Sequence, residues 1–418
     1  MCSRLFRAAT ALLMLACLAL PAQAQEWTRF RGPNGSGISD ATTVPTTWTE
    51  ADYNWRVELP GIGHSSPVIW KDKIFLTSTD EDKLVRCAFC LSRADGGILW
   101  KKEYPFEKHK RHEYNSYSSA TPAVDEQRVY VVWSTPDDYS LLAFTHDGRE
   151  VWKRNLGPYK SQHSCGTSPI VFQDMVIVGN DQDGPSSLIA VDRETGEKRW
   201  EVERKASTVA YSTPCIYEPA GESPELIFNS QAHGISGINP INGATIWEVG
   251  DVFNKRSVSS PVIVSGLIYG SCGSGGGGNY IVAVTPGSMA SPSAAKLAYK
   301  LEKSAPYVPT PIGVGRNIFF WSEQGVVSCV DAPTGEVHYQ ERVGGKYFGS
   351  PICVADRLFN MTTDGEVVVV AAKPAFEELA RNPSGEMSHA TPAVSDGVMY
   401  LRTLSHLISV GGSKATGR

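Results

Sequence analysis

The sequence lacks the features that mark nucleic-acid-binding, membrane-spanning or disulfide-stabilised proteins. Its 39 lysines and arginines are outnumbered by 44 aspartates and glutamates, so the net charge of −5 offers no basic surface for nucleic acid. After residue 24 no stretch of 18 apolar residues occurs, and no membrane-spanning helix is predicted there. Seven widely spaced cysteines remain beyond that point, an odd number that does not suit a disulfide framework. The composition, 41% hydrophobic and 20% charged, is that of a soluble globular protein.

Signatures of catalysis and of metal binding are missing too. There is no G-x-S-x-G, no H-E-x-x-H and no paired-carboxylate motif, so we predict no catalytic residue and no metal site. Cys87 and Cys90 form a C-x-x-C, but in a strand residues i and i+3 point to opposite faces, which favours buried core thiols. His109 and His112 are interleaved with basic residues that would repel a cation, and we expect a solvated loop there.

Residues 1–24 have the pattern of a signal peptide. Arg4 and Arg7 precede a short apolar run, and "AQA" at 22–24 provides a small-x-small cleavage site. We therefore expect export, with a mature chain beginning near Gln25. An alternative is a lipid anchor at Cys17, because "MLAC" resembles a lipobox. Both alternatives place the protein in the periplasm or associated with the cell envelope of a bacterium.

One short step recurs along the whole chain: a serine or threonine, a proline and an apolar strand. Successive prolines are separated by 40 to 55 residues, a period typical of propellers and other repeat arrays. The proline suits the first position of a strand because it donates no ladder hydrogen bond. We expect the preceding hydroxyl to bond the local backbone. The eight steps are Ser66-Pro67, Thr121-Pro122, Ser168-Pro169, Thr213-Pro214, Ser260-Pro261, Thr310-Pro311, Ser350-Pro351 and Thr391-Pro392.

Each repeat reads as four short strands joined by turns, which is one propeller blade. The fourth strand usually carries a tryptophan after an Asp-Gly or Thr-Gly turn, as in "DGREVWKRN". The last repeat lacks this strand, but "YNWRVELPG", with Trp55, precedes the first repeat and can complete it. The sequence thus predicts an all-β, eight-bladed β-propeller of four-stranded antiparallel blades, closed by an N-terminal strand.

The predicted organisation is a signal peptide at 1–24, an N-terminal strap at 25–49, the propeller at 50–412 and a tail at 413–418. The strap contains "RGPNGSG" (31–37), which is turn chemistry and lacks the ending of a phosphate loop. We expect the strap to lie against one face of the propeller. Repeat five has an insertion at 285–296, and repeat seven has "KPAFEELARNP" in place of a clear fourth strand. The glycine-rich stretch 273–278 is expected to be a flexible loop.

The residues just before each hydroxyl-proline step should gather around one mouth of the central channel. Aromatic, histidine and arginine side chains around a concave opening can bind a ligand or a partner. These candidates are His64, Tyr117, His163, Tyr211, Arg256, Tyr307, Tyr347 and His389. The loops between second and third strands open on the same face and add Asp80, Asp137, Asp181, Asn229, Glu323 and Asp364. A polar, aromatic mouth without a specific ligand is the alternative interpretation.

The stretch "AVDRETGEKRWEVE" (190–203) resembles the repeat signature of the PQQ-like β-propeller superfamily, A-x-D-x-x-T-G-x-x-x-W. "VDAPTGEVHYQER" is a weaker copy. One branch, the quinoprotein dehydrogenases, implies pyrroloquinoline quinone (PQQ) and Ca²⁺ on the propeller axis. Its vicinal cysteine pair is absent here, and none of its cofactor ligands can be matched by motif. The other branch, the BamB-like scaffold lipoproteins of outer-membrane protein assembly, implies eight blades, export and no cofactor.

The leading functional hypothesis is an exported binding or scaffolding module of the cell envelope, with envelope proteins as partners and without catalysis. No cofactor is expected, since the motifs do not support PQQ with calcium. Two alternatives remain open: a PQQ-dependent oxidoreductase, or a sensor that binds a small ligand at the channel mouth.

Overall fold

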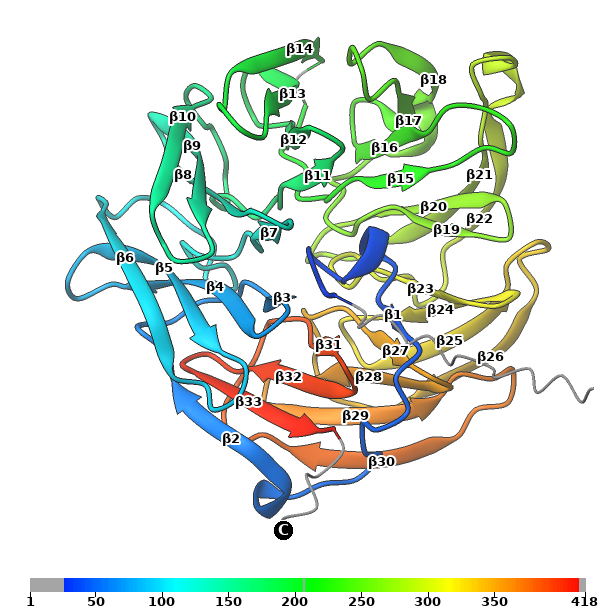
Figure 1. The fold of residues 1–418 in the computed structure, drawn as a ribbon. Coiled ribbons are helices and arrows are strands. Elements are labelled where there is room, and N and C mark those ends of the chain that lie inside the picture. Colours follow the sequence, from blue (N-terminus) through cyan, green and yellow to red (C-terminus); the bar gives the residue numbers. More distant parts are fainter. Residues whose placement is uncertain (1–25, 206, 413–418) are drawn as a thin grey trace, which may run out of the picture.

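A computed structural model describes residues 26–205 and 207–412. The expected signal peptide and C-terminal tail lie outside these residues. The fold is the predicted eight-bladed propeller, in which eight antiparallel sheets are arranged around a central axis (Figure 1). First strands of neighbouring blades contact one another around the axis, and fourth strands lie at the rim. No helix in the described ranges is long and apolar enough to cross a membrane.

The first four blades follow the repeat without interruption. Their strands are, for blade 1, β3 (Val68–Trp70), β4 (Lys73–Asp80), β5 (Val85–Ser92) and β6 (Ile98–Pro105); for blade 2, β7 (Ala123–Val124), β8 (Arg128–Thr135), β9 (Asp138–Thr145) and β10 (Glu150–Asn155); for blade 3, β11 (Ile170–Phe172), β12 (Met175–Asn180), β13 (Ser186–Asp192) and β14 (Lys198–Arg204); and for blade 4, β15 (Cys215–Tyr217), β16 (Glu225–Ser230), β17 (Gly234–Ile238) and β18 (Thr245–Val249).

The remaining blades include the irregular ones and the closure. Their strands are, for blade 5, β19 (Val262–Val264), β20 (Leu267–Cys272), β21 (Tyr280–Thr285) and β22 (Lys296–Leu301); for blade 6, β23 (Ile312–Val314), β24 (Asn317–Trp321), β25 (Val326–Asp331) and β26 (Val337–Arg342); for blade 7, β27 (Ile352–Val354), β28 (Arg357–Met361), β29 (Glu366–Ala371) and β30 (Glu378–Pro383); and for blade 8, β31 (Ala393–Ser395), β32 (Val398–Arg402), β33 (His406–Gly411) and the N-terminal β2 (Tyr53–Glu58). Four short 3₁₀ turns are η1 (Pro33–Gly35), η2 (Glu50–Asp52), η3 (Gly250–Val252) and η4 (Pro292–Ala294).

Ring closure occurs as the sequence predicts. The N-terminal strand β2 pairs antiparallel with β33, so one sheet contains both ends of the propeller. Trp55 takes the tryptophan position of this blade, opposite Ser409. Its indole N–H donates to the carbonyl of Arg93 in blade 1 at 3.2 Å, which ties the closing blade to its neighbour.

The hydroxyls of the repeated step do not bond their local backbone, contrary to expectation. Each accepts a hydrogen bond from the main-chain N–H of the equivalent residue in the preceding blade. The eight bonds form a closed ring at 2.9–3.3 Å, and the last runs from the Thr391 N–H to Ser66. The proline that follows has no N–H, so it adds no unpaired donor where eight strands converge.

The fourth-strand aromatic residues link neighbouring blades at the rim. In blade 2, Trp152 lies opposite Ala143, and its indole N–H donates to the Arg193 carbonyl of blade 3 at 3.2 Å. Gly196 in the same turn of blade 3 has φ of 70°, and a Cβ there would lie 2.6 Å from the Trp152 ring. The glycine of the Thr-Gly turn therefore provides both the turn conformation and the surface on which the preceding tryptophan packs. Trp100 and Trp200 repeat this arrangement.

Blade 7 differs from the other blades and from expectation. The segment "KPAFEELARNP" does contain a fourth strand, β30, although Ala380 occupies the aromatic position opposite Val369. Trp48 of the strap supplies a buried indole to this region and stacks on Phe359 with ring centroids 6.3 Å apart. The Asn382 side-chain oxygen of β30 holds the strap by accepting from the main-chain N–H of Trp48 at 2.9 Å. The missing aromatic side chain is thus compensated from outside the repeat.

The strap, residues 26–49, crosses the face opposite the channel mouth. Trp27 forms an antiparallel bridge with Ile69 of blade 1. Ile38 and Ser39 form β1, which pairs parallel with β27 and makes blade 7 five-stranded. Since these contacts are on blades 1 and 7 and Asn34 bonds Ile216 of blade 4, the strap spans the axis (Figure 1). The turn predicted from "RGPNGSG" is present as η1.

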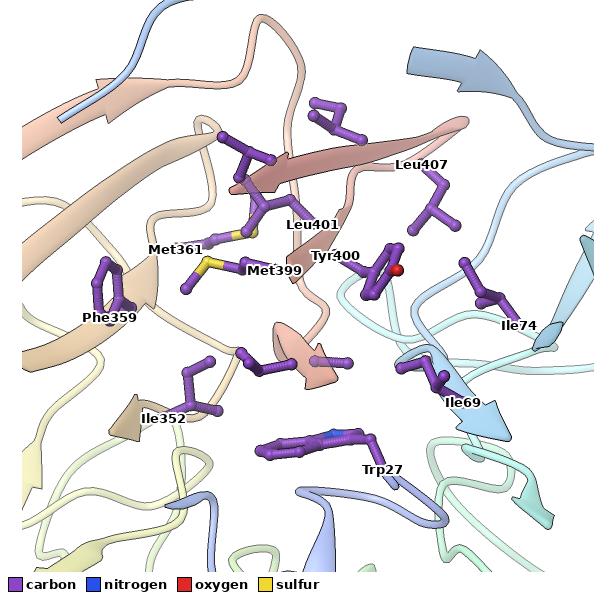
Figure 2. Close-up of a cluster of buried hydrophobic side chains, with 14 of the residues drawn as sticks. Trp27, Ile69, Ile74, Ile352, Phe359, Met361, Met399, Tyr400, Leu401 and Leu407 are labelled. Atoms are coloured by element: carbon purple, nitrogen blue, oxygen red, sulfur yellow. The ribbon is translucent and has the colours of Figure 1, made fainter. Parts of the chain in front are cut away.

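The hydrophobic core lies between blades, so second and third strands are buried on both faces. The largest cluster joins blades 7, 8 and 1, and Figure 2 shows the flat Trp27 ring lying beneath Ile352 and Ile69. The seven cysteines of the described residues are free and buried. Cys87 and Cys90 belong to different clusters on opposite faces of β5, which confirms them as core thiols. Burial raises the pKa of Cys87 to about 11 and that of Cys90 to about 12.

The hydroxyl ring can be tested at Thr310, which is 2% exposed and accepts from the Ser260 N–H at 3.0 Å. Thr310→Val keeps the shape but leaves this buried N–H unpaired, so the free energy of unfolding should fall by about 1–3 kcal/mol. Thr310→Ser keeps the acceptor, so its free energy of unfolding should fall by clearly less. Chemical denaturation measures both variants, and equal losses would show that the hydroxyl contributes nothing specific.

The blade-to-blade contact can be tested at Gly196. Gly196→Ala places a Cβ too close to the Trp152 ring and strains a left-handed backbone. The free energy of unfolding should therefore fall by about 1–3 kcal/mol. Gly221→Ala is the matched control, because Gly221 also has positive φ but would meet nothing within 4 Å. Thermal unfolding of both variants separates the two effects. A similar loss in each would assign the whole effect to the backbone and none to tryptophan packing.

Candidate binding site at the channel mouth

The mouth is formed by the connections into the first strands and is crossed by a loop from outside the repeat. Residues 106–117, between β6 and β7, contact His163 before blade 3 and also Phe348 and His389 before blades 7 and 8. Blades 3 and 7 are on opposite sides of an eight-membered ring, so this loop extends across the axis. It is not the freely solvated loop that we expected around His109 and His112, since both rings find aromatic partners.

One group of mouth residues surrounds Tyr114 on the side of blades 7 and 8. The His389 ring lies 4.5 Å from the His64 ring and 4.9 Å from the Phe348 ring, centroid to centroid. Tyr114 packs on Phe348 at 5.0 Å, and its carbonyl lies 3.2 Å from His389 Nδ1. Tyr114 is 49% exposed. Met387, two residues before His389 in the sequence, is 42% exposed. This arrangement leaves a partly open apolar and aromatic surface.

A second group lies on the side of blades 3 and 5. His112 stacks on His163 with centroids 4.6 Å apart and planes at 6°. Arg256 Nη1 lies 3.0 Å from His163 Nε2, which requires that nitrogen to act as an unprotonated acceptor. Tyr211 is adjacent, and its hydroxyl is 2.9 Å from that of Ser161. The group places the Arg256 guanidinium beside the His163 ring, which also contacts the Tyr211 ring.

The other predicted mouth residues have structural surroundings. Tyr117, the last residue of the crossing loop, is buried, and its hydroxyl donates to the His109 carbonyl at 2.6 Å. Tyr307 is partly buried, and its N–H donates to Glu323 at 2.7 Å. Tyr347 has no exposed surface and packs against Trp321 in the core cluster of blades 6 and 7. The structure therefore groups His64 with His389 and His163 with Arg256, and keeps Tyr347 away from the opening.

Tyr114, Phe348 and His112 were missed by sequence reasoning. Phe348 directly follows Tyr347, so the repeat alignment selected the buried member of an aromatic pair. Tyr114 and His112 belong to the crossing loop, which has no counterpart in the other repeats. The only signal in the sequence was the unusual density of aromatic and histidine residues in this one insertion.

The donor set of the mouth does not fit PQQ with calcium. Calcium takes about six to eight oxygen ligands, with carboxylates among them. Within the described ranges no three His, Cys, Asp or Glu side chains gather as a metal site. Of the second-loop residues, Asp181 pairs with buried Arg204 at 3.1 Å, and Glu323 accepts main-chain N–H groups. Asn229 is buried, Asp80 ends β4 and pairs with Lys83, and Asp137 and Asp364 are exposed.

Burial is the main cause that lowers the pKa values of three mouth histidines, His64, His163 and His389. Burial is the largest cause and lowers the pKa of His163 to about 4, with Arg256 and His112 adding repulsion and Asp183 opposing it weakly. The pKa of His64 is well below its usual value because of burial and the nearby His389 and Arg402. Burial also lowers the pKa of His389. The surface is thus least charged near neutral pH.

These shifts predict that stability falls as pH decreases from about 6.5 to about 4, the interval between the ordinary and lowered pKa of His163. In this interval the unfolded chain binds protons that the folded mouth does not, which favours unfolding. His163→Gln should flatten the dependence, whereas His338→Gln, at an exposed position on β26, should not. Denaturant midpoints between pH 8 and 4.5 measure this, and identical profiles for wild type and His163→Gln would contradict it.

Comparisons with solved structures identify the fold. BamB from Moraxella catarrhalis is 15% identical, with a TM-score of 0.61 over 91% of this chain and 100% of that chain. Quinohemoprotein alcohol dehydrogenase from Comamonas testosteroni is 12% identical, with a TM-score of 0.63 over 94% and 82% respectively. The computationally designed Ika8 protein is 11% identical, with a TM-score of 0.61 over 86% and 99%. Such low identities show the fold alone.

No curated protein gives a significant match to this chain. A family model gives the more specific result. The model described as outer membrane protein assembly factor BamB matches residues 49–180, 90–290 and 303–417, which together span nearly the whole propeller. By this match, together with the eight-bladed ring, the chain belongs to the BamB outer membrane protein assembly factor family.

Proposed function

We propose that this protein is a binding module of the bacterial cell envelope that uses the mouth face to hold a protein partner. Family membership supports an envelope role, and the BamB-like fold supports protein partners. The observation that carries the proposal is the surface made by Tyr114, Phe348 and His389. It combines a half-exposed tyrosine with partly buried aromatic rings on a rigid scaffold, and aromatic side chains are enriched at the centres of protein interfaces.

The electrostatics of this surface indicate the kind of partner. The histidines are held neutral, and Arg256 shares its guanidinium with His163 and Gln162 at 3.0 and 3.3 Å. An apolar segment of an envelope protein would match the aromatic group around Tyr114. A hydrogen-bond acceptor on the same segment would match Arg256 in the second group. The scaffold beneath the surface is fixed by the hydroxyl ring, so little conformational entropy would be lost on binding.

The enzyme alternative has weaker support. Asp181 is paired with Arg204 and Glu323 accepts main-chain N–H groups, and the crossing loop extends across the axis where a cofactor would have to bind. We derive no reaction from these residues. A role as a small-ligand sensor would require an open pocket between the two aromatic groups, and the crossing loop, which contacts one group through Tyr114 and the other through His112, lies between them.

A photo-crosslinking amino acid at Tyr114 tests the proposal in the protein's own host. It should give a discrete adduct with an envelope protein, whereas the same probe at Ile241 should not. Ile241 is the matched control because it is 63% exposed and lies in the turn between β17 and β18, on the opposite face. The double variant Tyr114→Ala/Phe348→Ala should reduce recovery of the partner about tenfold, the loss of one or two interface hot spots.

Ile241→Ala should leave recovery of the partner unchanged. Adducts of equal yield from both probe positions would indicate non-specific contact. An unchanged recovery with the folded double variant would contradict binding at this surface.

A further inference from the structure

The tip of the crossing loop, residues 112–114, is held on one side of the mouth by histidine nitrogens that accept hydrogen bonds. His112 stacks on His163 with ring centroids 4.6 Å apart. Arg256 Nη1 lies 3.0 Å from His163 Nε2, and the Tyr114 N–H donates to His112 Nδ1 at 3.3 Å. An arginine and a main-chain N–H can only donate, so both histidine nitrogens must be unprotonated. A proton on either one would replace a hydrogen bond with a clash of two donors.

A second pair of histidines meets the tip on the other side of the mouth. The His389 ring lies 4.5 Å from the His64 ring, and His389 Nδ1 lies 3.2 Å from the Tyr114 carbonyl. Because that carbonyl accepts, Nδ1 of His389 carries the proton of the neutral ring. Nδ1 of His64 is buried without a hydrogen-bond partner among the described residues. A further proton on either ring would place a positive charge directly against the neighbouring imidazole.

Among the described residues, no carboxylate lies within salt-bridge distance of these four rings. The histidines that do have such a partner are His233, 2.7 Å from Glu248, and His406, 3.1 Å from Glu386. Neither of them belongs to the two pairs. Charging a partly buried imidazole without a counter-charge is unfavourable. The closed position of the tip therefore depends on neutral histidines.

Cations outnumber acids among the charged groups that face the two pairs. Asp183, in the loop between β12 and β13, faces His163 and opposes the cations there only weakly. Glu81 is engaged by Arg111 at 2.8 Å, and Glu113 is exposed. Protonation of the rings would thus add charge to a region that is already positive. The facing cations are Arg256 and Lys110 at His163, and Arg111 and Arg402 at His64, while His389 faces His64 itself.

The base of the loop is fastened without these rings. Arg111 Nη2 pairs with Glu81 Oε1 at 2.8 Å, and Asn115 Nδ2 donates to the main-chain carbonyl of His163 at 2.6 Å. Neither contact changes when an imidazole takes up a proton. Protonation therefore acts on residues 112–114 and leaves the two ends of the loop in place.

We propose that the crossing loop is a pH-sensitive latch, whose tip covers the mouth while the four histidines are uncharged and detaches when they take up protons. In the detached state water reaches the rings, which then bind protons near the ordinary histidine pKa of about 6.5. In the closed state burial, together with the neighbouring cations, lowers the pKa of His163 to about 4. Since the detached state binds protons more tightly, acidification between these two values favours detachment.

Detachment would also remove Tyr114 from Phe348 and so dismantle the aromatic surface at the mouth. This consequence rests on the proposed function: a partner bound at the mouth near neutral pH would be released by acid. The latch itself does not rest on it, because residues 112–114 detach whether or not a partner is present.

Fluorine NMR of the full-length mature protein tests the latch, with a trifluoromethyl-phenylalanine in place of Tyr114 as the single label. One signal at about pH 7.5 should be replaced by a second, sharper signal toward about pH 4.5, and neutralisation should restore the first. The ratio of detached to closed tip should rise about tenfold per pH unit for each proton taken up. His163→Gln and His389→Gln should each reduce this slope, because glutamine keeps polar contacts but does not titrate.

His146→Gln is the matched control. His146 is also partly buried with a pKa lowered by burial, but it lies in the turn between β9 and β10 on the opposite face. Its substitution should leave the slope unchanged. A single signal throughout the pH range, or the same slope in wild type and both mouth variants, would overturn the latch. So would a loss of near-ultraviolet circular dichroism in step with the fluorine signals, because the event would then be global unfolding.

Crosslinking from position 114 at both pH values separates the latch from the proposed function. Loss of the adduct at low pH together with the second fluorine signal would support release by the latch. An adduct that persists while the tip is detached would overturn that release. Absence of an adduct already at neutral pH would contradict the proposed function, and the fluorine signals would still decide the latch.

Discussion

Eight hydrogen bonds between a serine or threonine hydroxyl and the main-chain N–H of the preceding blade hold the centre of this propeller. Each net contribution is modest, about 0.5–1.5 kcal/mol for a typical hydrogen bond. Their importance comes from closure, because the last bond joins blade 8 to blade 1 and no blade can shift along the axis alone. The proline beside each hydroxyl removes the one N–H that the crowded axis could not satisfy.

This ring also determines what the rest of the chain can do at the axis. On the strap side of the ring, the proline carbonyls remain available as acceptors, and Arg29 and Arg31 of the strap each donate to one of them. On the mouth side of the ring, the residues just before each hydroxyl-proline step converge and form the aromatic and histidine-rich mouth. The rim contacts, in which Trp152 packs on Gly196, fix neighbouring blades at the outside. Inner and outer contacts together make a rigid frame, so insertions such as the crossing loop can vary without disturbing it.

The repeat made most of the fold predictable, including the closing strand with Trp55 and the core thiols at Cys87 and Cys90. Each of these depends on a local pattern that occurs many times. The hydroxyl ring was not predictable, because the acceptor and donor are a whole repeat apart and the sequence shows only the local step. The mouth was predictable in part: His64, His389, His163 and Arg256 meet there, whereas Tyr347 turns inward because Trp321 offers a buried surface. The crossing loop has no repeated template, so its contacts required the structure.

Similarity of fold alone does not separate a binding protein from a dehydrogenase, because BamB and a quinohemoprotein alcohol dehydrogenase both match this chain over most of its length. The two functions must differ at the axis, where a cofactor enzyme needs an open pocket with convergent ligands. In this chain residues of its own lie at both ends of the axis: Trp27, Arg29 and Arg31 of the strap on one face, and the loop bearing His112 and Tyr114 on the other. What remains partly exposed at the mouth is the aromatic group of Tyr114, Phe348 and His389, on which the proposed binding role rests.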